Sequence, residues 1–141
     1  MYFDELEIGM KKEIPPAFIE KEEMIDFARK YDNIPLHTDE EYAKTTRFGK
    51  LIAPGVMSFL SVWAKYLEVD FFGEELIAGM STKIEWFRPV FPEDTLTSDA
   101  VVTNLTRKNE RNGIVEIVIN AFNEKGENVL KATTEALVKC K

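Results

Sequence analysis

The first half of the chain has helical periodicity. Four apolar residues of the segment 22–32 recur at i, i+3, i+4 and i+7, and they are Met24, Phe27, Ala28 and Tyr31. This spacing predicts one amphipathic helix. Pro35 disfavours helical conformation in the residue before it, so the helix should end at or before Ile34.

A second helix is expected directly after this break. The segment "TDEE", residues 38–41, matches a capping box in which Thr38 caps the first turn and Glu41 reaches back. The pattern therefore predicts that His37 lies just before a helix N-terminus.

The segment 54–69, "PGVMSFLSVWAKYLEV", is apolar on nearly all sides of a helix. Such a helix is expected to be wrapped by other structure. Pro54 and Gly55 ahead of it predict a tight approach to its N-terminus.

From Ile77 onward the pattern changes to short strands separated by turn residues. Strands are expected around 79–87, 95–106, 114–122 and 129–138, with Asn112-Gly113 as a hairpin turn. An earlier strand around 11–19 should lie at a sheet edge because it contains two prolines. We expect residues 1–141 to form one α+β domain, a buried helix wrapped by a curved antiparallel sheet, which is the outline of a hot-dog fold.

Composition narrows the function. The net charge of −7 argues against a broad nucleic-acid surface, which needs clustered Lys and Arg. The single cysteine, Cys140, allows no internal disulfide, and the N-terminal residues do not resemble a signal peptide. No apolar segment is long enough to span a bilayer. We therefore expect a cytoplasmic protein without a membrane or nucleic-acid partner.

The only histidine, His37, lies five residues after Asp32. On one continuous helix their side chains would point about 140° apart, and an extended chain would separate them by up to about 17 Å. A tight turn at Pro35 can bring them together. A carboxylate and an imidazole around one water suit hydration or dehydration chemistry, although a lone histidine is more often a surface or capping residue.

Other chemistries have less support in the sequence. One histidine and one cysteine make a zinc site improbable, so no metal is expected. The chain has no nucleophile elbow, no P-loop and no dinucleotide fingerprint. Gly55 has two interpretations: its N–H at a helix N-terminus could stabilise an oxyanion, or the glycine could serve only a tight turn.

The segment "YDNIPLHTDEEYA", residues 31–43, resembles the signature of MaoC-like dehydratases and (R)-specific enoyl-CoA hydratases, approximately G-D-x-N-P-[LI]-H-x-D-x-x-x-A. The matching positions are Asp32, Pro35, Leu36, His37, Asp39 and Ala43. The segments "YFDELEIGM", "FGKLIAPGVM" and "WFRPVFPEDTL" are also similar to family segments, in the right order along most of the chain.

The resemblance implies a hot-dog fold, usually dimeric, and syn addition of water to a trans-2-enoyl thioester, or its reversal. It implies that Asp32 and His37 activate the water and that the N–H of Gly55 holds the thioester carbonyl. No cofactor is implied other than coenzyme A within the substrate. The acyl carrier, coenzyme A or a carrier protein, stays open, with Lys44, Arg47, Lys50 and Arg88 as candidate phosphate contacts.

Four positions depart from the family pattern, namely Tyr31, Ile34, Pro54 and Glu93. Ile34 replaces an asparagine that supports the active-site hydrogen bonds of the family, so its effect on activity is the main question. Two alternatives therefore stay beside the hydratase: a hot-dog thioesterase, for which the central helix offers only Glu68 near its far end, and a thioester-binding module without catalysis. A homodimer is expected because a single curved sheet leaves edges for a partner.

Overall fold

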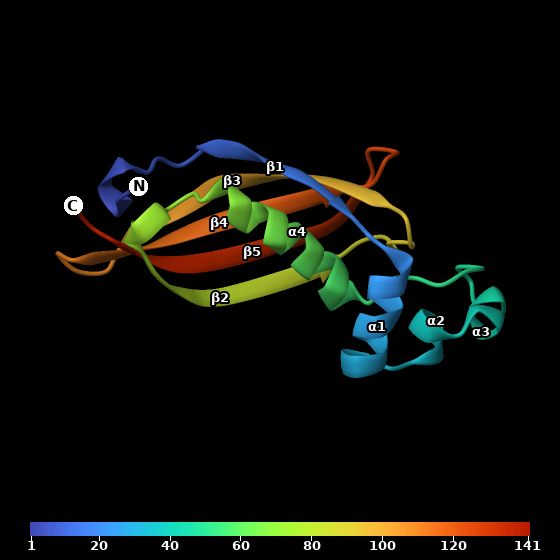
Figure 1. The fold of residues 1–141 in the computed structure, drawn as a ribbon. Helices are drawn as coiled ribbons and strands as arrows, with labels where there is room; N and C mark the ends of the chain where they lie inside the picture. Colours follow the sequence, from blue (N-terminus) through green and yellow to red (C-terminus); the bar gives the residue numbers. More distant parts are fainter.

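The computed structural model describes residues 1–141 and contains one five-stranded antiparallel sheet in the order β1-β3-β4-β5-β2. The strands are β1 (Lys11–Phe18), β2 (Leu76–Trp86), β3 (Thr95–Arg107), β4 (Asn112–Phe122) and β5 (Asn128–Lys139). The sheet curves around α4 (Gly55–Val69), which crosses one of its faces diagonally (Figure 1). This confirms the α+β arrangement predicted from the sequence.

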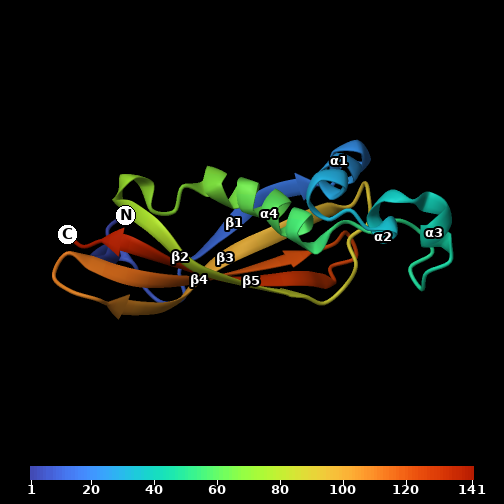
Figure 2. The same ribbon diagram turned by 90° about the horizontal axis from the view of Figure 1, so that it is seen from below.

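The remaining helices gather at one end of the sheet, beside the N-terminus of α4 (Figure 2). They are α1 (Lys21–Tyr31), α2 (Pro35–Thr38) and α3 (Glu40–Lys44), while the short turns η1 (Phe3–Glu5) and η2 (Gly73–Glu75) lie elsewhere in the chain. The predicted end of the first helix is confirmed, since α1 ends at Tyr31.

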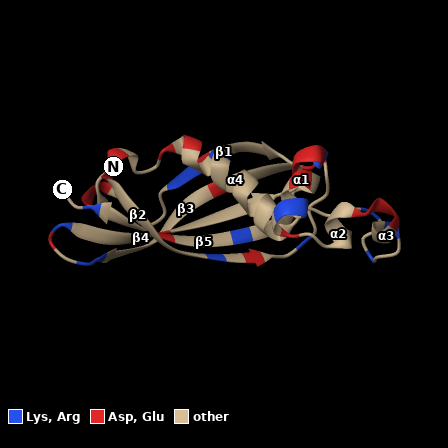
Figure 3. Cartoon of the chain, turned by 60° about the horizontal axis from the view of Figure 1, so that its bottom comes forward, with Lys and Arg blue, Asp and Glu red and all other residues tan.

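The core forms where α4 meets the inner face of the sheet. Met57, Phe59 and Val62 of α4 are buried, as are Ile117 and Ile119 of β4, where buried and half-buried residues alternate. This alternation is the period of two that places every second side chain on one face of a strand. Lys, Arg, Asp and Glu are frequent on α1 and α3 and occur along the strands and near the chain ends, whereas α4 is mostly uncharged (Figure 3).

One expectation for the central helix was wrong in part. Val56, Leu60 and Leu67 of α4 are 48%, 42% and 53% exposed in the single chain. They follow one another on one side of the helix, which neither the sheet nor the small helices cover. The sheet of one chain is therefore too narrow to surround α4, although the sequence makes the helix apolar on that side.

The two edges of the sheet differ in how they are protected. β1 lies at an edge, as its prolines predicted, and its pairing with β3 is interrupted between Ile14 and Ala17, where Pro15 and Pro16 lie. β2 forms the other edge over 11 residues and has Lys83 and Glu85 as its only charged side chains. A long and apolar edge of this kind is open to pairing with another strand.

The predicted Asn112-Gly113 turn was wrong. Both residues belong to β4, and the hairpin from β3 turns through residues 108–111 instead. The side chain of Asn109 makes this turn, because its Oδ1 accepts hydrogen bonds from the N–H groups of Arg111 and Asn112, both at 2.8 Å. Gly113 has a packing role: a Cβ there would collide with the ring of Phe3. No helix of the structure is both long and apolar enough to cross a bilayer.

Candidate active site

The bend between α1 and α2 brings Asp32 and His37 together. Asp32 is the C-cap residue directly after α1. Its N–H donates to the carbonyl of Ala28 at 2.8 Å, and its own carbonyl accepts from the N–H of Ile34 at 3.0 Å. Pro35 then starts α2 at the first helical position, where its missing N–H costs nothing. The chain therefore turns sharply within three residues, as the proline predicted.

The imidazole of His37 is held on both nitrogens. Its Nδ1 lies 2.7 Å from the carbonyl oxygen of Ile52, and its Nε2 lies 3.3 Å from Oδ2 of Asp32. A carbonyl oxygen can only accept, so Nδ1 carries a proton and donates it to Ile52. Nε2 is consequently the nitrogen that can take up or release a proton, and it faces a carboxylate.

The burial of the two partners is unequal. The side chain of His37 is 7% exposed, whereas that of Asp32 is 42% exposed. A buried imidazole with a fixed orientation is not the surface or capping histidine that the sequence alone left open. The pair can hold one proton between a ring nitrogen and a carboxylate oxygen, which is the arrangement that acid–base chemistry needs.

The predicted cap at Thr38 was wrong by one residue. Thr38 is the last residue of α2, and its hydroxyl donates to the carbonyl of Ile34 at 3.1 Å. Asp39 caps α3 instead, because its Oδ1 accepts from the N–H groups of Glu41 and Tyr42, both at 3.1 Å. His37 therefore lies inside a one-turn helix rather than before a helix.

An ion pair connects α3 to the start of α1. The ammonium of Lys21 contacts the carboxylate of Glu40. This hydrogen bond lowers the pKa of Glu40 and raises the pKa of Lys21, with the attraction of the two charges acting in the same direction. The start of α1 and the start of α3 are thus linked across the surface.

Gly55 starts α4, and its N–H has no hydrogen-bond partner within the chain. Its φ is not in the left-handed region, so a tight turn does not explain the glycine. The indole of Trp86 explains it: a Cβ at position 55 would lie 2.6 Å from Cε2 of Trp86. Trp86 also donates from Nε1 to the carbonyl of Gly55 at 2.9 Å.

An open cleft of about 430 Å³ joins these groups. His37, Ile52, Gly55 and Trp86 are among its lining residues, while Asp32 contacts His37 without lining the cleft itself. The hydrogen bond from the N–H of Ala53 to the carbonyl of Val90, at 2.7 Å, fixes the chain just ahead of α4. The cleft thus offers a basic nitrogen and an unpaired helix N–H on one surface.

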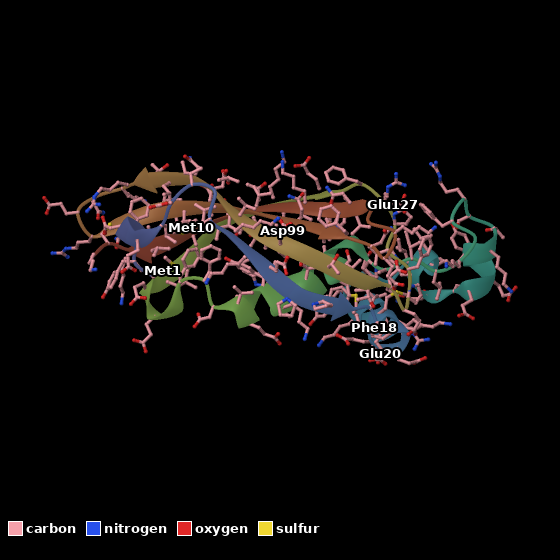
Figure 4. All side chains as sticks on the ribbon, turned by 90° about the horizontal axis from the view of Figure 1, so that it is seen from above. Met1, Met10, Phe18, Glu20, Asp99 and Glu127 are labelled. Carbon is pink, nitrogen blue, oxygen red and sulfur yellow. The ribbon has the colours of Figure 1, made fainter.

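The four cations named from the sequence are not placed alike. Arg47 and Arg88 line the cleft of His37, and Lys50 lines an adjoining pocket that also contains Arg88. Lys44 lies in neither pocket and pairs with Glu41 at 2.9 Å. The turn between β4 and β5 borders the adjoining pocket and lies at the same end of the molecule as Phe18 and Glu20, as the label on Glu127 shows (Figure 4).

The structure shows the surroundings of three residues that depart from the family pattern. The side chain of Ile34 is 44% exposed, so it fills no core position. Pro54 is fully buried and caps α4 without a side-chain hydrogen bond. Glu93 has φ 71°, a left-handed conformation that glycine adopts more easily, which explains the glycine at this place in the family motif.

Sequence reasoning missed two members of the site. Ile52 acts through its carbonyl, and a main-chain acceptor leaves no signature in residue type. Trp86 could have been suspected, because a tryptophan at the end of a predicted strand next to two prolines is an unusual surface residue. No cluster of three or more His, Cys, Asp or Glu side chains is placed to hold a metal ion.

Comparisons with known proteins place the chain in a known family. Residues 5–122 match the family model of the MaoC like domain. Over 140 residues, the chain is 28% identical to the uncharacterized protein YdeM of Bacillus subtilis, and the match covers 99% of each chain.

Two solved structures illustrate the structural likeness. The monoamine oxidase regulatory protein from Archaeoglobus fulgidus is 33% identical, with a TM-score of 0.94, covering 100% of this chain and 95% of that one. The (R)-hydratase from A. caviae involved in PHA biosynthesis is 28% identical, with a TM-score of 0.74, covering 96% and 98%. The chain therefore has the hot-dog fold and belongs to the MaoC-like domain family.

Proposed function

We propose that this protein is an acyl-thioester hydratase or dehydratase that adds water to a trans-2-enoyl thioester, or removes it from the (R)-3-hydroxyacyl form. The observation that carries the proposal is the contact of 3.3 Å between Nε2 of His37 and Asp32, with Nδ1 of His37 committed to Ile52. The likeness to an (R)-hydratase supports the same reaction class.

The proposed hydration step uses both side chains on one water. Asp32 accepts a hydrogen bond from the water and orients it, while Nε2 of His37 takes its other proton as the oxygen bonds to C3 of the enoyl group. The same nitrogen then returns a proton to C2. Because one residue removes and delivers the proton on one face, the addition is syn, and dehydration is the reverse.

Negative charge develops on the thioester oxygen when water attacks. The free N–H of Gly55, at the positive end of the α4 dipole, is the proposed donor for this oxygen. A donor that is already in place stabilises the charge only as it forms, which is what accelerates a reaction.

Coenzyme A within the substrate is the proposed carrier of the acyl group, with no further cofactor. Arg47 and Arg88 beside the cleft and Lys50 in the adjoining pocket are the proposed phosphate contacts. Lys44 is not included, since it pairs with Glu41 away from the cleft. Lys50→Ala should raise KM for crotonyl-CoA and leave KM for crotonyl-pantetheine, which has no phosphate, unchanged; equal effects on both would contradict this role.

A second copy of the chain is the proposed partner at the β2 edge. The exposed apolar residues of α4 and β2 form the surface that it would cover, namely Val56, Leu60, Leu67, Leu76, Ile77, Met80 and Trp86. Light scattering should give a dimer for the wild type and a weaker dimer for Met80→Lys. Ile8→Lys is the matched control, because Ile8 is equally apolar and 65% exposed but lies outside this surface.

The alternatives differ in how the site fits them. The thioesterase has little support, since Glu68 is 56% exposed and pairs with Lys65 at 3.5 Å rather than facing the cleft. A thioester-binding module is favoured by one observation, the exposed apolar side chain of Ile34 in place of the family asparagine.

The deciding experiment follows the loss of enoyl ultraviolet absorbance when the protein is mixed with crotonyl-CoA. Asp32→Asn and His37→Ala should each lower kcat by roughly 10²- to 10⁴-fold, the share that a positioned acid or base contributes. Release of free thiol without loss of absorbance would identify a thioesterase. Binding of crotonyl-CoA with neither reaction would identify a binding module.

A further inference from the structure

The first turn of α4 is anchored through its carbonyl groups. Pro54 is the N-cap residue and makes no side-chain hydrogen bond to the helix. A proline side chain has no acceptor, so it cannot bind the first N–H groups as an N-cap Ser, Thr, Asp or Asn does. α3 shows the usual arrangement, in which the carboxylate of Asp39 accepts from two N–H groups of the first turn. At α4, by contrast, the N–H of Gly55 is left without a partner in the chain.

Ser58 holds both peptide groups that meet at Gly55. Its N–H donates to the carbonyl of Pro54 at 3.0 Å, and its Oγ donates to the carbonyl of Gly55 at 2.7 Å. The first bond also orients the N–H of Gly55, because the C=O and N–H of one trans peptide point in opposite directions. Ser58 is 1% exposed, so its hydroxyl is shielded from solvent.

Trp86 holds the carbonyl of Gly55 from outside the helix. Its Nε1 donates to this carbonyl at 2.9 Å, and its ring packs directly on Gly55. Trp86 is the last residue of β2, so the bond ties the start of α4 to the edge of the sheet. Glycine has more conformational freedom than any other residue. The N–H of Gly55 therefore keeps one direction only if the peptide groups on both sides of the glycine are held.

Resting on the proposed hydratase function, we propose that Trp86 and Ser58 are positioning residues for the oxyanion donor. Both bind the carbonyl of Gly55, and together they hold the first turn of α4 so that the N–H of Gly55 points into the cleft that it lines with His37. Neither side chain binds the substrate. A donor fixed in advance needs no reorganisation when charge forms on the thioester oxygen.

The chain offers a matched control for each positioning residue. Trp63 is also on α4, but its ring stacks on Tyr66 at 4.9 Å and it does not bond Gly55. The Oγ of Ser61 donates to the carbonyl of Met57 at 2.9 Å, which is a similar bond further along the same helix. Trp63→Phe and Ser61→Ala therefore repeat the two test substitutions without touching the carbonyl of Gly55.

The first test measures hydration of crotonyl-CoA by Trp86→Phe and Ser58→Ala. Each variant should lose roughly fivefold in kcat with KM unchanged, because it removes one donor to the carbonyl of Gly55 and the thioester oxygen carries charge only in the transition state. The two control variants should keep the wild-type kcat. The pH dependence of kcat should match the wild type in all four variants, since none of them changes Asp32 or His37.

A second test needs no turnover. Butyryl-CoA is saturated and cannot be hydrated, so the stretching frequency of its thioester carbonyl, isotope-labelled at this carbon, can be followed by infrared spectroscopy in the bound state. A hydrogen bond from the N–H of Gly55 should lower this frequency in the wild-type protein. Part of the shift should be lost in Trp86→Phe and in Ser58→Ala, and all of it should be kept in the two controls.

The proposal is overturned if Trp86→Phe or Ser58→Ala keeps the wild-type kcat and carbonyl frequency, if the controls lose as much, or if the pH profile shifts. It is also overturned if wild-type protein does not lower the carbonyl frequency of bound butyryl-CoA. Failure of the proposed reaction is visible separately, as absence of crotonyl-CoA turnover by the wild type. In that case the carbonyl frequency alone decides the positioning role.

Discussion

The two ends of α4 are built from different chemistry. At its N-terminus, Gly55 faces an open cleft together with His37 and the indole of Trp86. At the C-terminal half, Trp63 and Tyr66 line a smaller cavity of about 110 Å³ whose other walls are mostly apolar. One helix thus has polar groups in an open cleft at one end and a mostly apolar cavity at the other.

The difference teaches that the two ends of α4 owe their geometry to different parts of the chain. The N-terminal end is held by hydrogen bonds to main-chain carbonyls, from His37 Nδ1 to Ile52 and from the N–H of Ala53 to Val90, so its geometry depends on the backbone. The C-terminal end is made of side chains packed on β4 and β5, which substitution can alter without moving the first site.

The largest expected effect is on kcat, and it distinguishes a glycine at the cleft, Gly55, from a glycine at the smaller cavity, Gly79. Gly55→Ala should lower kcat by roughly 10²-fold, because the new Cβ would lie 2.6 Å from the indole of Trp86 and displace the proposed oxyanion donor. Gly79→Ala, beside the smaller cavity, should leave crotonyl-CoA kinetics unchanged, since no atom lies within 4 Å of its added Cβ. Crotonyl-CoA hydration is the measurement.

A double variant checks the cause of that effect. Trp86→Leu combined with Gly55→Ala should recover part of kcat if the collision with the indole is responsible. A double variant no better than Gly55→Ala would show that the glycine is needed for another reason.

A smaller effect is expected at Ile34. Ile34→Asn should raise kcat/KM for crotonyl-CoA by about fivefold, the factor that corresponds to one hydrogen bond regained near the site. Ile34→Val keeps the side chain apolar and should have no effect. Since Ile34 is 44% exposed, thermal unfolding of both variants should match the wild type; equal kinetics of the two variants would contradict a polar role at this position.

The smallest effect is a pH dependence of stability at the C-terminal end. Burial raises the pKa of Tyr66 from 10.0 to about 12, so the unfolded chain loses this proton before the folded one. The contribution is fully present below pH 10 and is lost as pH rises from 10 to about 12. The unfolding temperature should fall less steeply over this pH range for Tyr66→Phe than for the control Tyr31→Phe, since the ring of Tyr31 is 66% exposed.

The fold was predictable wherever local pattern and burial agree. The strand alternation of β4, the prolines of β1 and the break at Pro35 each have one physical reading, and each prediction was confirmed. The Asn112-Gly113 dipeptide was wrongly predicted to form the hairpin turn, because a glycine is needed both in tight turns and where another side chain packs closely against the main chain. Here the glycine is explained by the ring of Phe3, which is far away in sequence and packs against Gly113.

The candidate site was predictable at its side chains and not at its main chain. The spacing of Asp32 and His37 around a proline indicated their approach, which the structure shows at 3.3 Å. The carbonyl of Ile52, which fixes the ring of His37, has no signature in the sequence. The cavity at Tyr66 depends on how α4 crosses the sheet, and that angle is set by packing across the whole molecule.

The placement of the two tryptophans has a spectroscopic consequence. The chain contains only these two, and Trp86 contacts Gly55 while Trp63 stacks on Tyr66 at 4.9 Å. Each end of α4 thus carries its own intrinsic fluorophore. Trp63→Phe leaves emission from Trp86 in the cleft alone, and Trp86→Phe leaves emission from Trp63 at the smaller cavity alone, so that changes at the two ends of α4 can be followed separately.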